Sequence, residues 1–209
     1  MSGGDQHDAP VDSNEQQLQT AVDPGRRELV KWAWRLPVIA ALGGAGYGVY
    51  EAARVHFLKP AASDDPQFED RPASRVAELS AFSSEWSSHD FELAGAPSLP
   101  AVAIRLPQSI PGGLTLSNPV GVDVAHFAAF TRICTHQHCI VSFSTDVEAI
   151  NFAFNYQGRH PALTCPCHLS VFDPLRAGRA VSGPAVHPLP RVRLKVIGTE
   201  LVADGIERA

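Results

Sequence analysis

The stretch CTHQHC, Cys134–Cys139, places two thiols and two imidazoles close together, as metal sites do. The other two of the four cysteines lie downstream in TCPCHLS, residues 164–170, with a histidine directly after the second. Two disulfides, a zinc site or a centre with mixed thiolate and imidazole ligands could use these residues. Disulfides alone would leave the histidines without a role. Zinc sites usually have about two to four residues between paired ligands, whereas only one separates Cys134 from His136.

The two stretches resemble the paired cluster-binding loops of Rieske iron–sulfur proteins, which read Cys-x-His-x-x-Cys and Cys-x-x-His with an extra cysteine in the second. In that family two cysteines bind one iron of a [2Fe–2S] cluster and two histidines bind the other. The resemblance implies one cluster per chain and four iron ligands, namely Cys134, His136, Cys165 and His168. It also implies that Cys139 and Cys167 form a disulfide between the loops.

The resemblance covers roughly residues 130–203 and includes two further features. Ser170 stands where the family often has a serine that donates a hydrogen bond to a cluster sulfur, and Gly183-Pro184 resembles the loop that covers the cluster. The chain departs from the family at three places, namely Gln137-His138 for Leu-Gly, Leu169 for glycine and Phe172 for tyrosine. Without a hydroxyl, Phe172 cannot donate a hydrogen bond to a ligand sulfur.

Around these loops, residues 77–209 form short apolar runs separated by Gly, Pro, Asn and Asp, a texture typical of β domains. Strands are expected at residues 101–106, 122–133, 149–154, 192–197 and 200–203, with a turn at Gly198-Thr199. Convincing helical periodicity is absent from this part of the sequence. The predicted fold is an all-β Rieske-type head, an antiparallel sandwich or barrel.

The N-terminal part predicts export and a membrane anchor. Residues 26–31, RRELVK, fit the twin-arginine pattern Arg-Arg-x-apolar-apolar-Lys. An uncharged run, Leu36–Tyr50, follows, with tryptophans before it and tyrosines near its end, as in membrane-spanning helices. We therefore expect a disordered cytoplasmic tail (1–25), an uncleaved transmembrane helix (26–55) and a flexible linker (56–76), with the head on the periplasmic or outer side. A buried or amphipathic helix of a soluble domain is the alternative.

The resemblance implies electron transfer as the Rieske subunit of a bacterial cytochrome bc complex, a quinol–cytochrome c oxidoreductase. Its partners would be membrane lipid, a cytochrome b subunit, a c-type cytochrome and quinol, with menaquinol expected if Phe172 lowers the potential. His168 would contact the quinol and accept its proton. A Rieske small subunit of an exported molybdenum oxidase of the arsenite-oxidase type is the alternative. A net charge of −5 and a pI near 6.0 argue against nucleic acid as a partner.

Overall fold

The computed structural model describes residues 24–56, 58–117 and 124–208. Most of the predicted tail, up to residue 23, and Val122 at the start of a predicted strand lie outside these residues. The chain divides into two compact units, residues 1–50 and 51–209. The second unit contains both cysteine stretches and all the strands found among the described residues.

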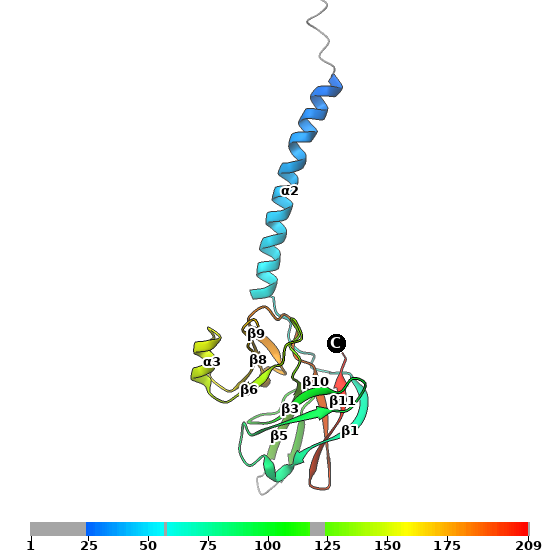
Figure 1. Cartoon of the computed structure of the whole chain (residues 1–209), viewed down its shortest axis with the longest axis vertical. Helices are drawn as coiled ribbons and strands as arrows, with labels where there is room; N and C mark the ends of the chain where they lie inside the picture. The colour runs from blue at the N-terminus through cyan, green and yellow to red at the C-terminus, as the bar shows by residue number, and fades with distance from the viewer. Residues whose placement is uncertain (1–23, 57, 118–123, 209) are drawn as a thin grey trace, which may run out of the picture. The chain divides into compact units, whose positions relative to one another are not determined.

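Helix α2, Pro24–His56, is the main element before the strands (Figure 1). Among the residues that the structure describes, no helix combines the length and apolar character needed to cross a membrane. The transmembrane anchor predicted for residues 26–55 is therefore not confirmed, although the segment is helical. The segment contains glycines and alanines, which are weakly apolar, and the charges of Lys31 and Arg35 stand near its start.

Two antiparallel sheets make up the β domain (Figure 1). The larger sheet has the order β1-β11-β10-β5-β3-β2, and β4 also pairs with β5. Its strands are β1 Phe68–Glu78, β2 Ser88–Leu93, β3 Leu99–Leu106, β4 Leu114–Ser117, β5 Val124–Thr131, β10 Arg191–Ile197 and β11 Glu200–Glu207. The smaller sheet has the order β6-β7-β8-β9, with strands β6 Ser142–Ser144, β7 Ala162–Cys165, β8 Ser170–Asp173 and β9 Arg179–Ser182. Short 3₁₀ turns occupy Leu79–Ala81 and Pro174–Arg176.

The β domain is held by apolar clusters that follow from its buried strands. β3 and β5 are buried along most of their length, as their nearly continuous apolar sequences require. One cluster joins the two sheets and contains Val102, Phe130, Phe172 and the thiols of Cys134 and Cys165. Cys134 and Cys165 therefore belong to the buried cluster that joins the two sheets.

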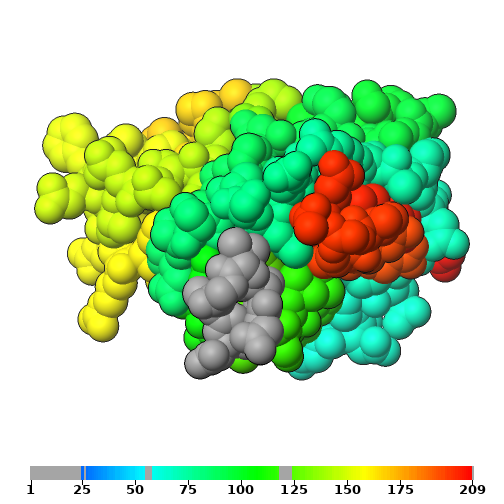
Figure 2. Space-filling model, turned by 90° about the horizontal axis from the view of Figure 1, so that it is seen from below, coloured from blue at the N-terminus to red at the C-terminus, as the bar shows by residue number. Residues whose placement is uncertain are grey.

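Two sequence-based predictions are wrong in detail. Residues 149–154 were expected as a strand, but helix α3, Val147–Ala153, covers most of them. The carboxylate of Asp146 accepts a hydrogen bond from the amide of Ala149 and thereby caps the helix. Residues 68–76, expected as part of a flexible linker, belong to β1, which pairs with β11. Figure 2 shows the end of the β10–β11 hairpin, in orange-red, against the turquoise segment that contains β1.

Candidate metal centre

The two cysteine stretches are loops attached to buried strands. The first follows β5 and is closed by a bridge between Ile133 and Ile140. Within it, the amide of Cys134 donates to the carbonyl of Cys139 at 2.8 Å, and the amide of His138 donates back to the carbonyl of Cys134 at 2.9 Å. The second loop connects β7 with β8, where Cys165 pairs with Ser170. These backbone bonds hold the backbone of both loops.

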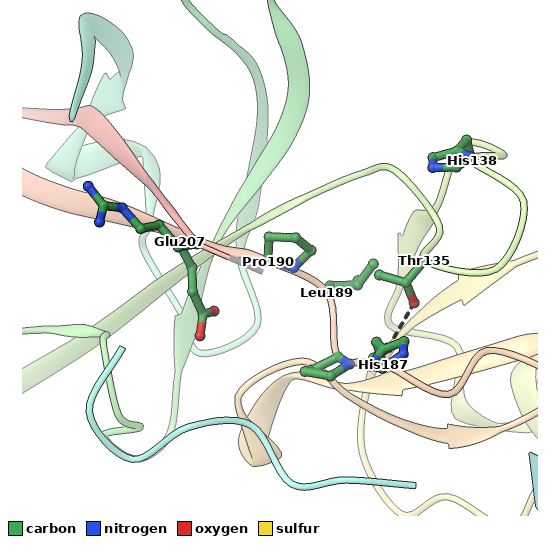
Figure 3. A pocket seen from close by; sticks show the side chains of 8 residues that line it. Thr135, His138, His187, Leu189, Pro190 and Glu207 are labelled. Carbon is green, nitrogen blue, oxygen red and sulfur yellow. Dashed lines mark hydrogen bonds between the residues drawn. The ribbon is translucent and has the colours of Figure 1, made fainter. Parts of the chain in front are cut away.

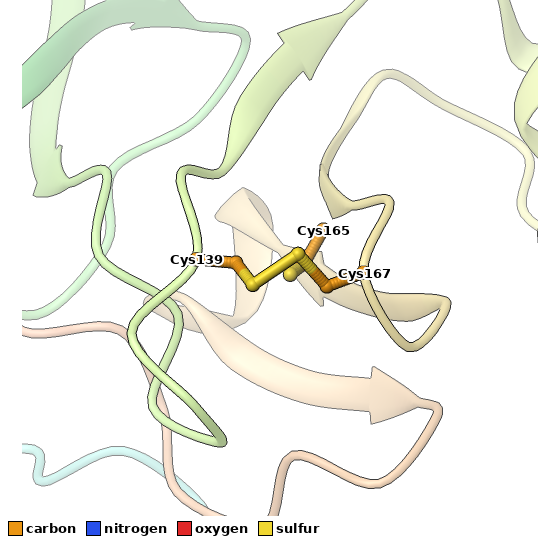
Figure 4. A group of neighbouring side chains, drawn as sticks. All are labelled: Cys139, Cys165 and Cys167. Atoms are coloured by element: carbon orange, nitrogen blue, oxygen red, sulfur yellow. A yellow bond between two sulfur atoms is a disulfide. The ribbon is translucent and has the colours of Figure 1, made fainter.

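The four cysteines divide into a bonded pair and a free pair. Cys139 and Cys167 form a disulfide with Cα atoms 6.5 Å apart, which confirms the predicted bridge between the loops (Figure 4). Cys134 and Cys165 are free and buried. Burial raises the pKa of the Cys134 thiol, and its contact with the neighbouring Cys165 thiol raises it further. Two adjacent buried thiols are suited to bind one metal ion, which would hold them as thiolates.

The three cysteine sulfur atoms that lie closest together are not the pair that the resemblance implies as iron ligands. Those of Cys139, Cys165 and Cys167 lie within 4.8 Å of one another. Cys139 and Cys167 are bonded to each other, so neither can supply a thiolate. The free thiol of Cys134 is therefore the better partner for Cys165, as the resemblance implies.

The histidines at the two loops also come together. The rings of His136 and His168 have centroids 4.9 Å apart and are perpendicular to each other. The Nδ1 atom of His136 is buried and has no hydrogen-bond partner in the described part of the chain. Such an atom costs roughly 1–3 kcal/mol when left unpaired, whereas a bound metal would accept its lone pair. The donor set of two thiols and two imidazoles fits an iron–sulfur cluster with mixed ligands.

Ser170 and Phe172 belong to β8, the strand that follows the second loop, and both are fully buried. The hydroxyl oxygen of Ser170 accepts a hydrogen bond from the amide of Ala185 at 3.1 Å, so its own proton is available to another acceptor. Phe172 packs in the cluster that contains the thiols of Cys134 and Cys165. Both residues thus belong to the buried strand that follows the second loop, and their influence on a cluster stays a prediction.

Two of the positions at which the chain departs from the family lie at the tips of the loops. His138 and Leu169 have φ angles of 57° and 59°, in the left-handed region that glycine adopts without steric cost. These are the positions where the family often has glycine, so the chain keeps this conformation with larger, exposed side chains. The tip that a partner would meet is bulkier here.

A cavity of about 420 Å³ opens beside the first loop (Figure 3). Thr135 lines it and donates a hydrogen bond to the carbonyl of His187 at 2.8 Å. The other lining residues are His138, Pro188, Leu189, Pro190, Glu207 and Arg208. The sequence does not predict the hydrogen bond between Thr135 and His187, because these residues are far apart in the chain.

Two further histidines of the β domain have partners away from the centre. His126 forms a hydrogen-bonded pair with Thr115 at 3.0 Å. His160 is partly buried and stacks on Trp86 with ring centroids 5.7 Å apart. Its Nε2 atom lies 3.6 Å from the carboxylate of Asp173.

The part of the chain that contains the centre matches a known protein family. Residues 120–193 match the family described as Rieske [2Fe-2S] domain. The chain contains a Rieske domain. This finding confirms the predicted cofactor, a [2Fe–2S] cluster, and the function of the domain, electron transfer.

Two curated relatives indicate the range of proteins that carry similar domains. Over 68 residues the chain is 40% identical to the cytochrome bc1 complex Rieske iron-sulfur subunit of Streptomyces lividans, covering 32% of this chain and 33% of the relative. Over 84 residues it is 33% identical to the iodate reductase subunit IdrB of Denitromonas iodatirespirans, covering 40% of each. The match therefore spans well under two thirds of either relative.

A solved structure with a similar chain is the soluble domain of the Rieske protein II (soxF) from Sulfolobus acidocaldarius. It is 21% identical, with a TM-score of 0.44, and the match covers 65% of this chain and 78% of that one.

Proposed function

We propose that the chain is the Rieske subunit of a cytochrome bc complex that oxidises quinol and passes electrons to a c-type cytochrome. The observation that carries the proposal is the contrast between buried thiols and an exposed imidazole. Cys134 and Cys165 are enclosed in the core, whereas His168 is exposed at the tip of the second loop. A quinol held by a partner subunit could therefore reach His168 without any rearrangement of the domain.

Four residues would hold the cluster in this proposal, namely Cys134, His136, Cys165 and His168. When bound, the cluster accepts one electron at a potential in the range of about −150 to +300 mV. His168 would accept the quinol proton on its exposed imidazole ring. The disulfide would keep the two loops in register while the tip contacts its partners, a cytochrome b subunit and a c-type cytochrome. Menaquinol is the expected substrate if Phe172 lowers the potential.

The likeness to the Streptomyces protein supports this assignment, since that relative is named as a bc1 subunit. The test is purification of the tagged full-length chain from its native membranes, followed by spectra and metal analysis. Co-purifying b-type haem and quinol-dependent reduction of cytochrome c would support the proposal. A chain isolated without b-type haem, with its cluster intact, would contradict it.

A second candidate is a Rieske small subunit of an exported molybdenum oxidase of the arsenite-oxidase type. The likeness to an iodate reductase subunit favours it, since a reductase subunit also passes electrons within a redox complex. Molybdenum in the purified complex, in place of b-type haem, would decide for this candidate.

The location stays a prediction from the sequence, with the N-terminus cytoplasmic and the Rieske domain on the outer side of the inner membrane. The twin-arginine pattern at residues 26–31 supports export. Replacing Arg26 and Arg27 by lysine should leave the domain in the cytoplasm, as protease protection of spheroplasts would show. Carbonate extraction would then test whether the exported chain is held by lipid.

A further inference from the structure

Lys59, in the segment between α2 and β1, is buried against the Rieske domain with 8% of its surface exposed. Its ammonium group donates hydrogen bonds to the carbonyl of Gly183, at 2.5 Å, and to the carbonyl of Ala185. The guanidinium group of Arg179 donates to the carbonyl of Lys59 itself at 2.5 Å. The side chain and the backbone of Lys59 are therefore both fixed, although sequence reasoning assigned this segment to a flexible linker.

The loop that Lys59 holds lies directly on the second cluster-binding loop. A Cβ atom added at Gly183 would lie 2.5 Å from the carbonyl oxygen of Leu169 and from the Cα atom of Ser170. The amide of Ala185, beyond the intervening proline, donates to the hydroxyl of Ser170 at 3.1 Å. A continuous set of contacts thus leads from the ammonium group to Ser170, which lies two positions after the predicted ligand His168.

The charge of Lys59 matters as well as its contacts. Burial lowers the pKa of its ammonium group. Hydrogen bonds to two carbonyls offset part of the cost of burying the positive charge. A buried cation beside a redox centre stabilises the extra negative charge of the reduced state, and the interaction is weakly screened away from water.

We propose that Lys59 is a positioning residue that holds the 183–185 loop against Ser170 and raises the reduction potential of the cluster. The inference depends on the [2Fe–2S] cluster of the Rieske domain, whichever complex the domain serves. The redox change is the uptake of one electron by the cluster, supplied by an electrode in the test. Lys59 itself binds neither the cluster nor a substrate.

The test is voltammetry of the full-length, cluster-loaded chain at fixed pH, with three variants. Lys59→Met keeps the apolar stem but removes the charge and the donors, whereas Lys59→Arg keeps both. Lys195→Met is the matched control, since it removes a lysine that pairs with Asp204 within the β10–β11 hairpin. Iron and sulfide analysis of each sample verifies that the cluster is complete.

Lys59→Met should lower the equilibrium constant for reduction of the cluster on the order of tenfold. For one electron this corresponds to a midpoint potential lower by about 59 mV. Lys59→Arg and Lys195→Met should stay near the wild-type midpoint. An unchanged midpoint in Lys59→Met with a full cluster would overturn the proposal, even if the variant were less stable to denaturant. An equal fall in Lys195→Met would also overturn it.

Should Lys59→Met fail to retain its cluster, hydrogen exchange is compared between the wild-type protein and the variants, all without cluster. The amide of Ala185 should exchange slowly in the wild type and in Lys59→Arg but faster in Lys59→Met, and equal exchange in all three would overturn the proposal. Rapid exchange at Ala185 in the wild-type protein would refute the proposed loop contact. Because cluster content and potential are measured on the isolated chain, failure here differs from failure to find b-type haem in the native complex.

Discussion

The disulfide between Cys139 and Cys167 should contribute several kcal/mol to the stability of the domain. It joins residues 28 positions apart, and the loop that it closes contains β6, α3 and β7. In the chain-entropy model, closing a loop of this length lowers the entropy of the unfolded chain by an amount worth about 3.6 kcal/mol at room temperature. Replacing both cysteines by serine should remove this stabilisation.

The assay is urea unfolding of the cluster-loaded chain, followed by tryptophan fluorescence and by the visible absorbance of the cluster. With a slope of about 2 kcal/mol per molar urea, the unfolding midpoint should fall by about 1.8 M. Cluster absorbance should disappear earlier than in the wild type, because the bridge fixes the loop that contains Cys165. The potential should change as well, since the two loops would no longer be tied.

Reduced wild-type protein provides the matched control. Because a disulfide reductant also reduces the cluster, both proteins are compared in its presence by tryptophan fluorescence. The urea midpoint of the reduced wild type should then match that of the double-serine variant. A fall of less than about 1 kcal/mol on loss of the bridge would refute the loop-closure account. Peptide mapping that finds both thiols free in the oxidised protein would refute the bridge itself.

Three further predictions concern the cluster and the larger sheet. Replacing any one of the four predicted iron ligands by alanine should abolish the low-g electron paramagnetic resonance signal, and normal cluster content in a variant would refute that ligand assignment. The four ligands are Cys134, His136, Cys165 and His168. Phe172→Tyr should raise the midpoint potential and Ser170→Ala lower it, each by roughly 43 mV for a hydrogen bond of about 1 kcal/mol; an unchanged potential in Phe172→Tyr with an intact cluster would contradict the reasoning. Burial alone would raise the pKa of Asp204, but hydrogen bonds from Arg193 and Lys195 lower it below the ordinary 3.8. A carboxyl with a lowered pKa in the folded state adds stability above its unfolded pKa and loses it as the pH falls through the folded value. Asp204→Asn should therefore lower the free energy of unfolding by roughly 1 kcal/mol near neutral pH, a modest loss because the partners of Asp204 are partly exposed. At about pH 2 the substitution should lower it by almost nothing. An equal loss of stability at both pH values in urea titrations would show that the charge is not the cause.

The sequence, through its resemblance to Rieske cluster-binding loops, predicted the chemistry of the centre, and its apolar runs predicted the class of the fold. Ligand types and their spacing are local properties, so Cys134–Cys139 and the second loop could be interpreted without knowing the path of the chain. Alternating and continuous apolar runs likewise predicted β3, β5 and β10 close to their observed positions. A strand was expected at residues 149–154 because the run is apolar, whereas the local cap at Asp146 favours a helix.

The tertiary structure decided what depends on distant partners. β1 forms because β11 supplies its hydrogen bonds, and nothing within residues 68–76 signals that pairing. The disulfide partners were implied by a family resemblance, and their sulfur atoms meet only because β7 brings the second loop to the first. The contact of Lys59 with Gly183 spans 124 positions. A lysine among prolines and acidic residues looks like solvated linker, and only packing against the domain shows that its charge is buried.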